Sequence, residues 1–159
     1  MASKVTVVYV GGFLVPKGRM PYNDDISFPS NTNVIVVYPS GVSSIHDRVM
    51  QIFYELKGGM IHYGEAHSKF HGHSSTGSTF PDGKYPEWNQ DNPIHIIGHS
   101  FGGPTVRALH YYLSLGNMFH GYSTNESWIT SVTTVNSPLN GGLRVYSYGA
   151  NLNSPSIVR

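Results

Sequence analysis

One serine lies in a sequence pattern that can make it a nucleophile. Ser100 is the centre of Gly98-His99-Ser100-Phe101-Gly102, directly after an apolar, β-branched run and directly before a helix-like segment. Strand, tight turn and helix is the context in which Gly-x-Ser-x-Gly forms a nucleophile elbow, with the hydroxyl exposed at the carboxyl end of a sheet. The alternative is a serine in an ordinary glycine-rich turn. The context favours the nucleophile and therefore acyl-transfer chemistry.

A nucleophilic serine also needs hydrogen-bond donors for the oxyanion that forms on the attacked carbonyl group. The N–H of Phe101 lies at the start of the following helix, where backbone N–H groups and the helix dipole point to the same place. The second donor usually comes from a loop after an early strand. The turn Gly11-Gly12-Phe13 follows the first apolar run, so we expect the Phe13 N–H to be this donor.

The sequence lacks the usual order of a catalytic triad, in which an acid and then a histidine follow the serine. The only acidic residue after Ser100 is Glu126, and the histidines after Ser100, His110 and His120, both precede it. A triad is defined by geometry rather than by order, which leaves open a histidine upstream of the serine, such as His71. A serine without a base is a weak nucleophile, so we expect these residues alone to be nearly inactive.

A second group of residues has the side chains of a metal site. His67, His71 and His73 lie within seven positions, and Asp47 precedes His67 by twenty. Zn²⁺ takes histidine nitrogen and aspartate oxygen in a tetrahedron. On spacing alone the competing interpretation is favoured, because polar loops accumulate histidines. Asp47 also has a structural interpretation, since it follows a helix N-cap candidate, Ser44, by three residues.

The elements that would position these residues alternate in the α/β manner. We expect strands over residues 4–10, 33–38, the run before Ser100 and 128–135, with helices from Ser43 or Ser44 to about Lys57 and from Thr105 to Leu115. Unbroken apolar strands indicate a parallel sheet. The first run ends in a glycine turn without a cleavage site, so a buried strand is favoured over a secretory signal, and a cytoplasmic location over secretion.

Two segments have no clear periodicity. Residues 60–92 form a long, polar, histidine-rich excursion, and we treat residues 59–92 as a metal-loop insertion into the domain. Residues 139–159 are expected to be an irregular tail. The pattern as a whole indicates a single partial α/β domain over residues 1–159, comparable to the first half of a larger one.

The composition excludes several classes of function. The chain has 159 residues, of which 12% are charged, with a formal net charge of +1 and no cysteine. No basic run provides a surface for nucleic acid, and no disulfide or thiolate metal site is possible. No apolar stretch approaches the roughly 20 residues that span a bilayer. An exposed core edge in a partial domain predicts self-association.

The segment from Ser43 to Gly142 resembles the zinc-containing, thermoalkalophilic family of bacterial triacylglycerol lipases, which have the α/β-hydrolase fold. Four stretches carry the resemblance: His46-Asp47-Arg48, the Gly64-x-Ala66-His67 to His71-Gly72-His73 segment, Ile94 to Gly103, and Ser131 to Thr134 with Pro138 before Gly141. The joint match is more specific than any single motif. It implies a three-layer fold with a mostly parallel sheet, of which the carboxyl-terminal half is missing.

The resemblance implies a serine hydrolase that cleaves carboxylic esters of lipids through an acyl-enzyme, with a lipid or ester as substrate. It implies that the nucleophile is Ser100, and that the oxyanion donors are the N–H groups of Phe13 and Phe101. Relatives typically have histidine at the position of Gly11 and glutamine at that of Phe101, so the chain departs from the family pattern at two places.

The resemblance also implies a structural zinc ion, whose ligands would include Asp47, His67 and His73 but not His71. In that family the fourth ligand, the triad acid and histidine, the lid helices and a calcium site lie beyond the matched part. Two other functions stay open: a catalytically inactive module that binds lipid or a partner, and an acyltransferase of the same fold.

Overall fold

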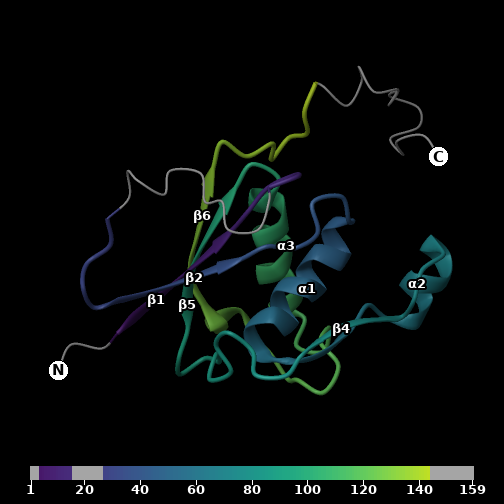
Figure 1. Ribbon diagram of the computed structural model, residues 1–159, viewed down its shortest axis with the longest axis horizontal. Coiled ribbons are helices and arrows are strands. Elements are labelled where there is room, and N and C mark those ends of the chain that lie inside the picture. The colour runs from purple at the N-terminus through teal and green to yellow at the C-terminus, as the bar shows by residue number, and fades with distance from the viewer. Residues whose placement is uncertain (1–3, 16–26, 144–159) are drawn as a thin grey trace.

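The computed structural model describes residues 4–15 and 27–143, and a parallel four-stranded sheet forms its centre (Figure 1). The strands are β1 (Val5–Val10), β2 (Thr32–Val37), β5 (Ile94–His99) and β6 (Ile129–Val135), in the spatial order β2-β1-β5-β6. Each expected strand is confirmed to within one residue at either end. All three strand pairs are parallel, so the carboxyl ends of the strands meet at one edge of the sheet.

Two long helices connect these strands. Helix α1 (Ile45–Lys57) begins after Ser44, whose Oγ accepts the Asp47 N–H at 3.1 Å, so the predicted N-cap is confirmed. Helix α3 (Gly102–Ser114) begins three residues before its expected start. The first turn of α3 contains Pro104, which is tolerated there because the N–H of a first-turn residue has no intrahelical partner.

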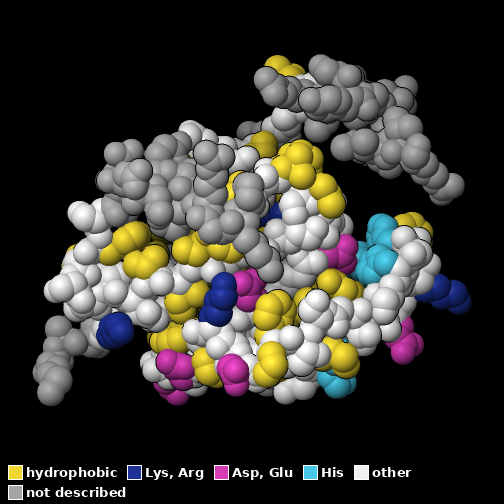
Figure 2. Space-filling model, in the orientation of Figure 1, with side chains coloured by type: hydrophobic (Ala, Val, Ile, Leu, Met, Phe, Trp, Pro, Cys, Tyr) yellow, Lys and Arg dark blue, Asp and Glu magenta, His cyan; other side chains and the backbone are white. Residues whose placement is uncertain are grey.

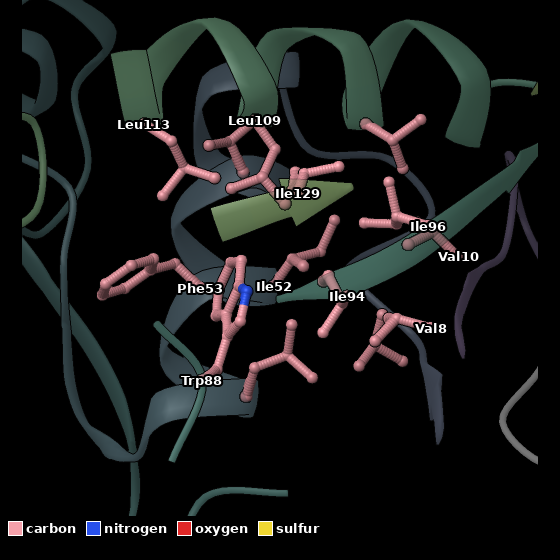
Figure 3. Close-up of a cluster of buried hydrophobic side chains, with 14 of the residues drawn as sticks. Val8, Val10, Ile52, Phe53, Trp88, Ile94, Ile96, Leu109, Leu113 and Ile129 are labelled. Carbon is pink, nitrogen blue, oxygen red and sulfur yellow. The ribbon is translucent and has the colours of Figure 1, made fainter. Parts of the chain in front are cut away.

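Both helices pack on the same face of the sheet and enclose the hydrophobic core (Figure 3). The core side chains come from all the central elements, including Val8, Val10, Ile52, Phe53, Trp88, Ile94, Ile96, Leu109 and Leu113, each fully inaccessible to solvent. Burial of one such side chain stabilises the fold by roughly 1.5–3 kcal/mol. The indole N–H of Trp88 donates to the Trp128 carbonyl at 2.8 Å, so the largest core side chain has its polar group satisfied.

The expectation of an irregular excursion over residues 60–92 is wrong for its first part. Strands β3 (Gly59–His62) and β4 (Thr76–Phe80) pair antiparallel, and helix α2 (Glu65–His71) lies between them. The paired strands carry α2 away from the central sheet (Figure 1). A four-residue strand and a seven-residue helix are too short to show a period in the sequence. The insertion over residues 59–92 stays a prediction.

A short 3-10 helix, η1 (Glu126–Trp128), precedes β6. Within residues 4–15 and 27–143, no helix is long and apolar enough to cross a bilayer. The predicted tail over residues 139–159 lies mostly outside the described residues, as does much of the loop between β1 and β2.

Candidate functional site

Ser100 occupies the turn between β5 and α3 with a backbone φ of +54°, in the left-handed region. Its N–H donates to the Val135 carbonyl at the end of β6, at 2.9 Å, and its carbonyl accepts the Gly103 N–H at 3.0 Å. A non-glycine residue held in this region costs of order 1–3 kcal/mol and persists only where its surroundings fix it. Such strain at the end of a parallel strand is the geometry of a nucleophile elbow.

The two glycines of the pentapeptide are required because other backbone atoms approach them closely. A Cβ atom on Gly98 would lie 2.5 Å from the Gly102 carbonyl oxygen, and a Cβ on Gly102 would lie 2.5 Å from the Val10 carbonyl oxygen. Carbon and oxygen atoms do not approach this closely, and backbone atoms cannot easily give way. The glycines therefore allow β1, β5 and α3 to pack tightly around Ser100.

The turn after β1 lies directly against Ser100. A Cβ atom on Gly12 would lie 2.7 Å from the Ser100 Cβ and 3.1 Å from its Oγ. Phe101, which directly follows Ser100 in the chain, occupies the N-cap position of α3. The fold thus brings Gly12, the neighbour of Phe13, against Ser100, which Phe101 follows directly in the chain.

The histidines that follow Ser100 lie elsewhere. His110 is on α3 and borders a cavity with Arg107 and Tyr111. His120 stacks on His62 with ring centroids 4.6 Å apart. Within residues 4–15 and 27–143, the contacts of these two histidines therefore do not place either of them at Ser100.

A second cluster forms where α1 meets the β3-α2-β4 segment. The Oδ1 atom of Asp47 lies 3.0 Å from Nε2 of His67 and 3.7 Å from Nε2 of His73. His46, Asp47 and His67 each offer a ligand atom within 4.8 Å of the others, so this cluster could hold a metal ion. Figure 2 shows histidine side chains exposed beside α2, with an acidic side chain nearby.

Sequence reasoning gave no role to His46, although it precedes Asp47 directly. Its ring stacks on His67 with centroids 3.9 Å apart. Its Nε2 lies 2.7 Å from the Tyr63 carbonyl oxygen and its Nδ1 lies 3.1 Å from the Tyr112 hydroxyl. A carbonyl only accepts, so Nε2 carries the proton and Nδ1 accepts the tyrosine O–H. Both ring nitrogens are therefore engaged.

The capping and metal interpretations of Asp47 are compatible. The Ser44 hydroxyl donates to Oδ2 of Asp47 at 2.9 Å, which leaves Oδ1 facing His67 and His73. Burial, followed by the proximity of His46, lowers the pKa of His67, while Asp47 opposes this shift. The lowered pKa favours the neutral imidazole, which is the form that binds metals.

Comparison with known proteins assigns most of the chain to one family. The family model described as "Lipase-like, C-terminal domain" matches residues 30–153. A lipase of Staphylococcus hyicus is 38% identical over 116 residues, covering 64% of this chain and 18% of the relative. Lipase 1 of Staphylococcus aureus strain Mu50 is 35% identical over 118 residues, covering 64% of this chain and 17% of the relative. The chain thus spans less than a fifth of these relatives.

Solved structures agree in fold. The crystal structure of Staphylococcus hyicus lipase superposes with a TM-score of 0.76 at 29% identity, covering 93% of this chain and 45% of that one. Lipase 1 from Pelosinus fermentans gives 0.76 at 30% identity, covering 91% and 44%. EstA from Clostridium botulinum gives 0.75 at 27%, covering 93% and 39%. The α/β-hydrolase-like fold is confirmed, and the chain belongs to the lipase-like C-terminal domain family.

Proposed function

We propose that this chain carries the nucleophile and the oxyanion donors of a serine hydrolase that cleaves carboxylic esters of lipids, of the triacylglycerol class. The observation that carries the proposal is the strained turn at Ser100, between a parallel strand and a helix, with Gly12 packed against it. Kinship with bacterial lipases supports the substrate class.

In the proposed reaction, the Ser100 Oγ attacks the ester carbonyl carbon and the carbonyl oxygen becomes an oxyanion. The N–H groups of Phe13 and Phe101 donate hydrogen bonds to this oxygen. Removal of one such donor costs roughly 2.7–4 kcal/mol in other serine hydrolases. Collapse of the intermediate expels the alcohol, which takes the proton given up by the Ser100 hydroxyl, and leaves an acyl-serine. Water then cleaves this ester, which releases the acid and restores the hydroxyl. The proposal assigns the base and the acid of the triad to no residue of this chain.

A fluorophosphonate probe tests the nucleophile, because it reacts with activated serine hydroxyls. Because the sequence assigns no base to Ser100, we expect slow labelling: after prolonged incubation, intact-protein mass spectrometry should find one probe on Ser100, and Ser100→Ala should abolish it. Hydrolysis of a short p-nitrophenyl ester should disappear in the same variant. If the unsubstituted chain neither reacts with the probe nor hydrolyses the ester, the enzymatic proposal fails for these residues. The alternative of a non-catalytic α/β module would then be preferred.

We further propose that the second cluster binds a structural Zn²⁺ through Asp47, His67 and His73. Ligand atoms on a tetrahedral zinc ion, at about 2.0–2.1 Å from the metal, lie roughly 3.3 Å apart. The distances of 3.0 and 3.7 Å from the Asp47 carboxylate to the two imidazoles are close to this value. The Nδ1 atom of His73 lies 2.8 Å from the Ser74 carbonyl oxygen, which holds its proton there and leaves the Nε2 lone pair available.

In this proposal His46 supports the His67 ring by stacking and is not a ligand. When bound, the zinc ion would tie α1 to the β3-α2-β4 segment. Zinc analysis after dialysis distinguishes the roles: we expect His73→Ala to lose zinc, and His46→Phe, which keeps an aromatic ring, to retain it. His71→Ala is the matched control, because it removes a histidine only two residues before His73. If zinc persists in His73→Ala and is lost in His46→Phe, the ligand assignment is wrong.

A further inference from the structure

Arg48 is a wholly buried arginine that contacts residues next to the candidate active site. Its Nη2 donates to the Gly11 carbonyl at 2.7 Å, its Nε donates to the Thr105 hydroxyl at 3.1 Å, and its Nη1 donates to the Ser40 carbonyl. No carboxylate within residues 4–15 and 27–143 forms an ion pair with it. Burial of an unpaired charge is expensive, so a guanidinium held by neutral oxygens calls for an explanation.

Two of the three partners of Arg48, Gly11 and Thr105, belong to the segments that supply the proposed oxyanion donors. Gly11 begins the turn that contains Phe13, and its neighbour Gly12 lies against Ser100. Thr105 accepts from Arg48 and in turn donates to the Phe101 carbonyl at 2.8 Å. The guanidinium carbon also lies 5.2 Å from the centre of the Phe101 ring.

We infer that Arg48 is a positioning residue that connects the Gly11–Phe13 turn to the start of α3. It thereby fixes the positions of the two oxyanion donors relative to each other. This inference rests on the proposed function of Ser100. The end of β1 and the start of α3 are far apart in the chain, and one side chain from α1 connects them. The planar guanidinium reaches three acceptors in fixed directions, whereas a lysine ammonium is a compact point charge that cannot reproduce this fork.

The charge on Arg48 strengthens the arrangement. Burial lowers the pKa of Arg48 to about 10, so the side chain remains protonated at neutral pH. Hydrogen bonds from a charged donor are shorter and stronger than those between neutral groups. Loss of the guanidinium would also leave the Gly11 carbonyl buried without this donor, which favours movement of the turn.

Arg48→Lys and Thr105→Val test the inference, with Leu113→Ala as the control. Thr105→Val keeps the shape of the side chain and removes only its hydroxyl group. Leu113 is equally buried in α3 but lies eight residues beyond Thr105, about 12 Å along the helix. The measurement is the reaction of Ser100 with a fluorophosphonate, resolved into kinact, KI and the fraction of protein labelled.

Because the donors act on the developing negative charge, we expect kinact to fall at least tenfold in Arg48→Lys, with KI nearly unchanged. Thr105→Val should give a smaller fall of the same kind. A merely structural role predicts a smaller labelled fraction with unchanged kinact, as expected for Leu113→Ala. Equal kinact values in Arg48→Lys and Leu113→Ala would overturn the inference.

A second readout does not depend on Ser100 reacting. Backbone ¹⁵N order parameters of Gly12 and Phe13 should fall from about 0.85, typical of rigid backbone, towards 0.6 in Arg48→Lys but not in Leu113→Ala. Unchanged order parameters would also refute the role of Arg48. If the unsubstituted protein does not react with the probe while the order parameters change as expected, the proposed function fails and the positioning of the turn by Arg48 stands.

Discussion

Replacement of Gly12 by alanine should move the proposed oxyanion loop away from Ser100. The backbone of Gly12 does not have a positive φ, so alanine meets no conformational penalty there, and space alone decides the outcome. The added Cβ would lie 2.7 Å from the Ser100 Cβ and 2.9 Å from the His99 carbonyl oxygen. Non-bonded carbon atoms prefer about 3.5–4.0 Å, so the turn must retreat by about 1 Å.

A displacement of this size has a large expected effect on reactivity and a small one on stability. Misplacement by about 1 Å can lower a rate by about a hundredfold, which is also the lower end of the cost of losing one oxyanion donor. Overpacking of this kind costs about 1–3 kcal/mol. We therefore expect the fluorophosphonate labelling rate to fall by about two orders of magnitude while the protein remains folded.

Gly11→Ala is the matched control, because it makes the same chemical change in the same turn. A Cβ atom on Gly11 would have its nearest contact with the Val15 Cβ at 3.4 Å, which is ordinary packing. The assay compares labelling rates of the three proteins at equal folded concentration, with circular dichroism to verify folding. If Gly12→Ala reacts at the rate of Gly11→Ala, the Gly11–Phe13 turn does not contribute to the reactivity of Ser100.

Three further changes have expected outcomes. Ser44→Ala removes the N-cap of α1 and should cost about 1 kcal/mol of unfolding free energy in urea titration, and an unchanged midpoint would contradict this capping role. Trp88→Ala should cost about 3–5 kcal/mol in the same assay, whereas a loss below 1 kcal/mol would show that the core refills the space. Zinc should dissociate on acidification, because protonated imidazoles do not bind metal. Since burial lowers the pKa of His67, the protein should still retain zinc below pH 6.5. Release of zinc already above pH 7 would be inconsistent with this ligand assignment.

Features that depend on neighbouring residues could be predicted from the sequence. The four central strands follow from apolar runs, and the start of α1 follows from Ser44 and Asp47. The elbow at Ser100 follows from two glycines flanking a serine between a strand and a helix. In each case the residue types and their spacing within a short stretch indicate the element, so the local pattern contains the information.

The short elements of the β3-α2-β4 segment were missed for a related reason. Their stability comes from pairing with each other and from contact with α1, not from a period of their own. The role of His46 was also missed, because its stacking on His67 joins residues that only the packing of this segment brings together.

The sequence by itself therefore determined the α/β pattern and the candidate nucleophile, and its resemblance to a lipase family indicated Asp47, His67 and His73 as candidate zinc ligands. Only the tertiary structure decided that Gly12 touches Ser100 and that Arg48 bonds to Gly11 and Thr105, which lie 37 and 57 positions away. Such contacts depend on how distant segments pack, and the chain pattern around Arg48 resembles that of any amphipathic helix. Its burial and its partners appear only when β1, α1 and α3 are assembled around one core.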